Sequence, residues 1–245
     1  MKFATFLFMS VIFLSCSKEM EQETIPFSEA SYKIVVTLNW ISPKFGVPAG
    51  AHVTALTGMV HNKDTFLWMP GKFATAGMED VAEIGNNAKM NVELDAILLS
   101  NKALSKFSIP PPSVTGMVEM DLTFNTNYPY ISFASMIAPS PDWFMGIHDF
   151  NLLNNKTWIN DSTISLIVYD AGTESGDVFG YNNPETTPRQ TISLLTPANA
   201  SVLANGNTSV ASIGTIRFIL IGPKCSAKLR IHLQYDNTKQ LQHVL

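Results

Sequence analysis

The chain has 245 residues, of which 46% are hydrophobic and 15% are charged, and its formal net charge is −4. This length and apolar content suffice for one large domain with a sizeable core, with or without a C-terminal extension. The acidic balance and the absence of a Lys/Arg cluster argue against nucleic acid as a partner.

The N-terminus has the pattern of an export signal. Lys2 precedes an apolar run over residues 3–14, which is too short to span a bilayer as a mature helix. The run ends directly at a small residue followed by Cys16. We therefore expect a lipoprotein signal peptide over residues 1–15 and lipidation of Cys16. The alternative is an ordinary signal peptide with a chance cysteine.

A polar, acid-rich stretch follows the cysteine, and we expect a flexible tether over residues 16–30 because this composition buries little apolar area. The pattern resembles the surface-export signal of bacterial lipoproteins. It implies a cell-envelope protein anchored to the outer membrane, facing either the periplasm or the outside. Cys225 is the one other cysteine, so an acylated Cys16 leaves no disulfide framework.

Most of the remaining chain has a strand-like pattern. The first predicted strand covers residues 32–40, where apolar and polar residues alternate and β-branched types are frequent. Short apolar runs at 52–60 and 66–69 follow, the second one ending at a Pro-Gly turn. Further strands are expected at 116–124, 130–137, 144–153, 163–169 and 190–195. This succession predicts a mainly β protein.

A helical period interrupts the strands between residues 78 and 106, where apolar residues recur every three or four positions and proline is absent. Three prolines at 110–112 end this segment. We expect one or two inserted helices lying across the sheet. The segment 197–245 is expected to be a loop followed by two late strands, 213–221 and 228–235, that close the edge of the sandwich.

Two short loops carry an aspartate beside an apolar strand. Asp142 follows two prolines that stop the preceding strand, and Asp170 ends a strand before a glycine turn. Acidic loops at the ends of two strands can converge on Ca²⁺, which takes several oxygen ligands in irregular geometry. The alternative is that both aspartates form Asx-turns and serve their loops only.

These loops also carry a family resemblance. The runs PSPDWFMG (139–146) and YDAGTESG (169–176) resemble the spondin N-terminal domain family of the F-spondin and mindin type. Upstream, LTGMVHN (56–62) and AEIG (82–85) follow in the family's order, and the resemblance covers roughly residues 31–196. It implies an antiparallel, C2-like β-sandwich outside the cell that binds calcium and mediates adhesion to an extracellular protein or glycan.

The resemblance assigns a Ca²⁺ site to Asp142 and Asp170. A third carboxylate in the family usually comes from the strand before the first loop, where this chain has Thr123. Asp121 lies on the same strand face, because side chains alternate, and is expected to substitute for it. Glu174, in the loop that follows Asp170, is expected to add a further oxygen.

Two other functions compete with calcium-dependent adhesion. Asp142 paired with Glu83 or Asp170 would suit a glycan hydrolase. A row of exposed tryptophans would suit a glycan-binding accessory protein. We expect Trp40, Trp68 and Trp143 in the core and leave Trp158 exposed, because only the first three lie in or beside apolar runs.

A catalytic function has little support in the motifs. The chain contains no G-x-S-x-G or H-E-x-x-H pattern and no cofactor fingerprint. We therefore expect a binding module rather than an enzyme.

Overall fold

The computed structural model describes residues 26–41, 47–204 and 207–224. The expected signal peptide, the lipidation site at Cys16, most of the tether, Cys225 and the predicted strand 228–235 lie outside the described residues. Within the described part, no helix is long and apolar enough to cross a membrane.

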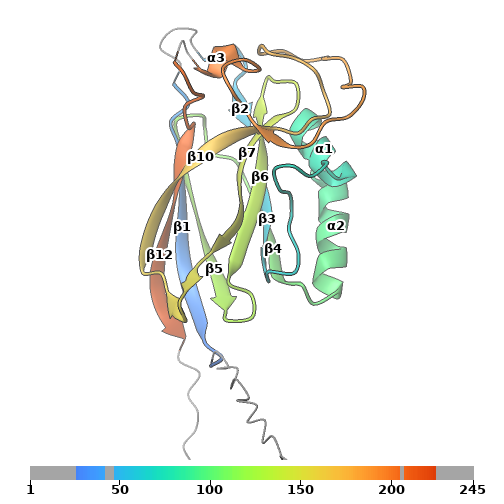
Figure 1. The fold of residues 1–245 in the computed structure, drawn as a ribbon. Coiled ribbons are helices and arrows are strands. Elements are labelled where there is room, and N and C mark those ends of the chain that lie inside the picture. Colours follow the sequence, from blue (N-terminus) through green and yellow to red (C-terminus); the bar gives the residue numbers. More distant parts are fainter. Residues whose placement is uncertain (1–25, 42–46, 205–206, 225–245) are drawn as a thin grey trace, which may run out of the picture.

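The described part is dominated by antiparallel strands that form one long, strongly bent sheet, so the predicted mainly β, antiparallel fold is confirmed (Figure 1). The main strands are β1 (Glu29–Leu38), β3 (Leu56–His61), β4 (Ala103–Ile109), β5 (Met117–Asn125), β6 (Tyr130–Ala138), β7 (Trp143–Asn151), β10 (Asp161–Asp170) and β12 (Gly214–Lys224). The short strands are β2 (His52–Val53), β8 (Leu153–Asn154), β9 (Thr157–Trp158) and β11 (Ser193–Leu194).

The strand order is β4-β3-β6-β7-β10-β12-β1-β5, with β2 beside β6 and β11 beside β10. The late strand β12 pairs with both β1 and β10, so it lies inside the sheet, whereas an edge position was expected. The sheet curves until it is nearly closed around one core. This arrangement places the loop between β6 and β7 next to the loop that follows β10.

The main core lies inside the bend of the sheet. Along β1, alternate residues such as Tyr32, Ile34 and Val36 are fully buried, as the sequence alternation predicts. The expected core positions of Trp40, Trp68 and Trp143 are confirmed. The expectation of an exposed Trp158 is wrong, because its ring packs edge-on against Tyr32 and its indole N–H donates to the Ser28 hydroxyl.

Two helices, α1 (Ala76–Ile84) and α2 (Ala88–Leu99), pack on the outer face of the sheet and enclose a second apolar cluster (Figure 1). The Thr75 hydroxyl accepts the Met78 N–H at 3.1 Å and caps α1, which ends at Gly85 in a left-handed conformation. The prediction of one or two helices is confirmed. Its extension to residue 106 is wrong, because residues 103–109 pair with β3 as strand β4. A short helix, α3 (Ser201–Ala204), lies in the expected loop.

Candidate functional site

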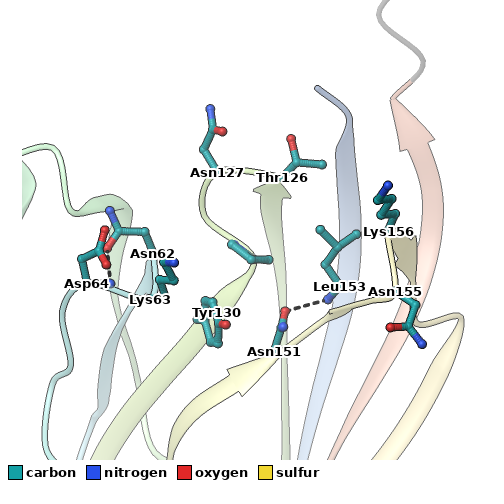
Figure 2. Close-up of a pocket in the computed structure, with 11 residues that line it drawn as sticks. Asn62, Lys63, Asp64, Thr126, Asn127, Tyr130, Asn151, Leu153, Asn155 and Lys156 are labelled. Atoms are coloured by element: carbon teal, nitrogen blue, oxygen red, sulfur yellow. Dashed lines mark hydrogen bonds between the residues drawn. The ribbon is translucent and has the colours of Figure 1, made fainter. Parts of the chain in front are cut away.

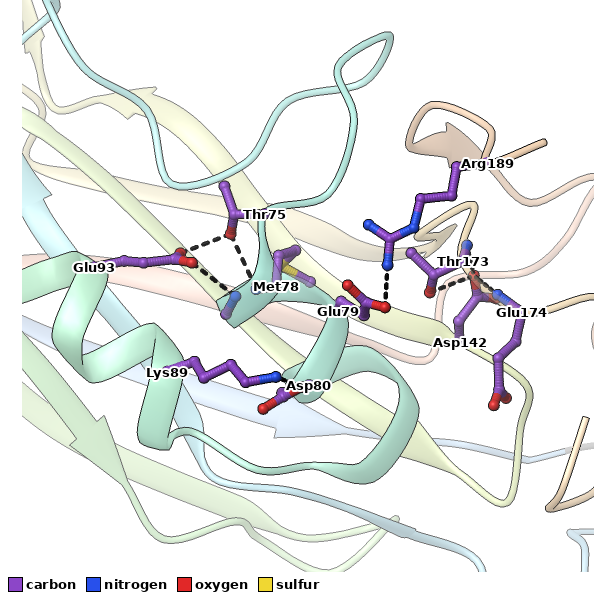
Figure 3. Close-up of polar contacts among 11 residues, drawn as sticks. Thr75, Met78, Glu79, Asp80, Lys89, Glu93, Asp142, Thr173, Glu174 and Arg189 are labelled. Carbon is purple, nitrogen blue, oxygen red and sulfur yellow. Dashed lines mark hydrogen bonds and ion pairs between the residues drawn. The ribbon is translucent and has the colours of Figure 1, made fainter. Parts of the chain in front are cut away.

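Asp142 is the centre of a cluster of acidic side chains at one end of the sheet. It lies in the loop between β6 and β7 and is fully buried. Its Oδ2 accepts the backbone N–H of Thr173 at 2.7 Å and of Glu174 at 3.1 Å, and the Thr173 hydroxyl at 3.3 Å (Figure 3). One carboxylate thus ties the β6–β7 loop to the loop that follows β10.

Asp170 stands at the end of β10, and its Oδ1 accepts the Gly172 N–H at 2.7 Å. This bond to the residue two positions ahead is an Asx-turn, so one oxygen of Asp170 stabilises its own loop, as the alternative to metal binding predicts. Gly172 has φ +77°, and a Cβ there would lie 2.3 Å from the Gln190 carbonyl oxygen. The turn therefore requires glycine.

Two glutamates complete the cluster. Glu174 follows Thr173 in the second loop, and Glu83 reaches the same place from α1, close enough to the Thr173 hydroxyl to compete with Asp142 for its one proton. Glu83 interacts electrostatically with both Asp142 and Glu174. Four carboxylates from a helix and two loops therefore share one region.

The charges of these groups are poorly compensated. Burial raises the pKa of Asp142, and its hydrogen bonds from Thr173 and Glu174 oppose that shift. Burial and the Asp142 charge raise the pKa of Asp170 to about 6. Burial, together with the charges of Glu83 and Asp142, raises the pKa of Glu174 to about 6.

Burial likewise raises the pKa of Glu83, and the nearby Thr173 hydroxyl opposes that shift. Arg189 lies close enough to lower that pKa but forms an ion pair with Glu79 (Figure 3). Among the described residues, the cluster thus carries more negative charge than the cations beside it neutralise.

A buried oxygen tests whether this site fits a cation. Asp142 Oδ1 is buried and has no hydrogen-bond partner among the described residues. Such an atom is costly without a partner, and Ca²⁺ prefers carboxylate oxygen. The described residues contain no group of three His, Cys, Asp or Glu side chains arranged to hold a metal, so hydroxyl, carbonyl or water oxygens would have to complete the shell. The carboxylate oxygens therefore fit a hard cation if hydroxyl, carbonyl or water oxygens supply its remaining ligands.

The structure brings together Asp142, Asp170 and Glu174 but not Asp121. Asp121 is exposed on β5, the last strand of the sheet order, opposite Lys33 of β1, whose pKa it helps to raise. It therefore faces a lysine on the outer surface, and its side chain does not join the two loops.

From the sequence, Glu83 was expected only as a partner in hydrolysis, and Thr173 had no expected role. Both positions lie in runs that carry the family resemblance, residues 82–85 and 169–176, but their spacing does not show that they reach Asp142, which depends on the packing of α1 and the second loop on the sheet. The described residues around Asp142 therefore form a larger acidic site than the two loop motifs indicate.

Comparison with known proteins agrees with the resemblance to the spondin N-terminal domain. The sequence profile of the spondin N-terminal domain, Spondin_N, matches residues 30–206. Human Spondin-2 is 32% identical over 188 residues, which are 72% of this chain and 55% of that protein. Rat Spondin-2 is 33% identical over 72% of this chain and 56% of its own length.

Rat Spondin-1 is 31% identical over 68% of this chain but only 22% of its own length. The chain therefore spans about half the length of the Spondin-2 relatives and a smaller share of Spondin-1. The profile match runs from the second residue of β1 through α1, α2 and both acidic loops and ends before β12, and the chain belongs to the spondin N-terminal domain family.

Proposed function

We propose that this protein is an extracellular, calcium-binding adhesion module that holds a protein or glycan ligand at its acidic loops. The observation that carries the proposal is the buried Oδ1 of Asp142, which has no partner among the described residues, within a cluster of four carboxylates. A bound cation would supply the positive charge that the cluster lacks. Family membership adds support, because the spondin-type motifs imply calcium and adhesion.

Different residues would hold the ion and the ligand. Asp142 and Asp170 would hold the ion between the two loops, with Glu174 at the rim. A polar cavity of about 480 Å³ adjoins them and is lined by Asp170, Glu174 and Asp177, with Thr186, Gln190 and Asn199. A ligand in this cavity would meet Asp170, Glu174 and the loop that follows β10, and the size of the cavity is typical of binding sites.

We propose further that the module is held at the cell envelope as a lipoprotein of the outer membrane. The apolar run that ends at Cys16 supports this anchoring. The tether after the cysteine would let the module reach a partner away from the membrane surface.

The pKa shifts of the carboxylates favour a binding role over hydrolysis. A hydrolytic pair needs one carboxyl that holds its proton and one that loses it. Here burial raises the pKa of Asp142, Asp170 and Glu174 alike, and neighbouring carboxylates add to the shifts of Asp170 and Glu174. A shared upward shift is the response of buried carboxylates that lack a counterion.

The test is thermal unfolding with and without Ca²⁺. Binding to the folded state alone at 100 times the dissociation constant would stabilise it by about 2.7 kcal/mol. Asp142→Asn should abolish the calcium-dependent shift, whereas Asp121→Asn, the matched control on β5, should retain it. A shift of equal size in Asp142→Asn, or none in the parent, would contradict the proposal.

A further inference from the structure

A second cavity lies at the opposite end of the sheet from the acidic loops. Strand β6 runs from Tyr130, which lines this cavity, to Ala138, which precedes the loop of Asp142. The cavity measures about 480 Å³ and is built from the ends of β3, β5 and β7 and from the β8–β9 hairpin (Figure 2). Nothing in the proposed calcium site uses it.

The lining of this cavity combines amides with an apolar floor. Four asparagines contribute side chains: Asn62, Asn127, Asn151 and Asn155. Tyr130, Pro129 and Leu153 supply apolar surface, and Lys63, Asp64 and Lys156 bring charges of both signs. Amides both donate and accept hydrogen bonds, so this lining suits a ligand rich in hydroxyl groups better than one with concentrated charge.

Two of the amides are oriented by the backbone. Asn62 Oδ1 accepts the Asp64 N–H at 2.9 Å, and Asn151 Oδ1 accepts the Leu153 N–H at 2.9 Å (Figure 2). Each bond fixes which end of the amide is oxygen. The NH₂ groups of Asn62 and Asn151 have no protein partner among the described residues, and they remain as donors for a ligand.

The aromatic ring is also fixed in place. Tyr130 stacks on His61 with ring centres 5.8 Å apart and an interplanar angle of 27°. His61 is fully buried, its Nδ1 donates to the Asn62 carbonyl at 2.7 Å, and burial lowers its pKa. Its neutral Nε2 then accepts the Ser132 hydroxyl at 2.8 Å. A ring held in this way loses little conformational freedom when a ligand covers it.

We propose that this cavity binds a saccharide unit of a glycan, independently of calcium. The apolar face of a sugar ring would pack on Tyr130, and its hydroxyl groups would meet the amides of Asn62, Asn127 and Asn151. The site would give the protein a second contact point at the end of the sheet away from the acidic loops.

The experiment uses an array of defined neutral, N-acetylated and acidic oligosaccharides, followed by titration of the retained compound. Tyr130→Leu keeps apolar volume but removes the ring and should weaken binding about tenfold. Asn127→Ala removes an exposed rim amide whose side chain has no hydrogen bond to the rest of the described protein, and it should weaken binding several-fold. Asn160→Ala, the matched control, alters an exposed amide outside the cavity and should leave affinity unchanged.

Chelation separates this site from the acidic loops. Retention of the oligosaccharide should persist in chelator and in Asp142→Asn, even if calcium-dependent adhesion fails. Retention of no oligosaccharide would overturn the proposal. Equal affinity in Tyr130→Leu and Asn127→Ala, or loss of binding with chelator, would also overturn it, the last by assigning the glycan to the calcium site.

Discussion

Neutralising Asp170 should stabilise the metal-free protein at neutral pH. Its pKa is about 6 in the folded protein against an ordinary value of 3.8, so the folded state disfavours the ionised form. Each unit of difference corresponds to about 1.4 kcal/mol, and partial exposure of the side chain reduces the total to about 1–2 kcal/mol. Asp170→Asn removes this penalty and keeps an amide oxygen for the Gly172 N–H.

The sign of the effect depends on pH. Because the folded state binds this proton more tightly, the parent loses stability as pH rises from about 4 to about 6, through the unfolded and then the folded pKa. Below about pH 4 the carboxyl is protonated in both states, and the advantage of the variant should disappear. Above about pH 6 the full difference should remain.

Urea denaturation of both proteins without metal, at several pH values, measures this difference directly. With saturating calcium the order should reverse, because the parent gains the ion and the variant lacks one charged ligand. A variant that is less stable than the parent at every pH without metal would refute the reasoning about uncompensated charge. It would show that Asp170 stabilises the loop through its Asx-turn more than its charge destabilises it.

Three further changes test other parts of the account. Gly172→Ala should cost about 1–3 kcal/mol in denaturation, because alanine disfavours φ +77° and its Cβ would meet the Gln190 carbonyl; unchanged stability would refute the assigned turn. Thr75→Ala should cost about 1 kcal/mol by removing the cap of α1, and Thr75→Ser should recover most of it; equal losses in both would point to packing instead. Cys16→Ala should release the protein from membranes on fractionation, and a variant that stays bound and is equally processed would exclude lipid anchoring.

Local patterns were sufficient for much of the fold. Alternation predicted β1 because one face of that strand meets the core and the other meets solvent. The change to a helical period located α1 and α2, since both bury one stripe against the sheet. The two loop motifs predicted that Asp142 and Asp170 lie in neighbouring loops.

The errors arose where distant segments decide the outcome. Residues 103–109 form strand β4 because β3 offers a free edge there, which local composition does not reveal. Trp158 is buried because Tyr32 lies against it, 126 positions earlier in the chain. Asp121 shares a strand face with Thr123, as a substitute ligand would, but β5 lies at the far end of the sheet order from the loop of Asp142.

The most direct measurement of the central claim is a crystal structure of the protein grown in saturating calcium. We expect one ion at a Ca–O distance of about 2.3–2.6 Å from Asp142 Oδ1, with a ligand from Asp170 and further oxygens from the loops or water. The contradicting result is an Asp142 Oδ1 that accepts a hydrogen bond from protein or ordered water, with no ion between the two loops.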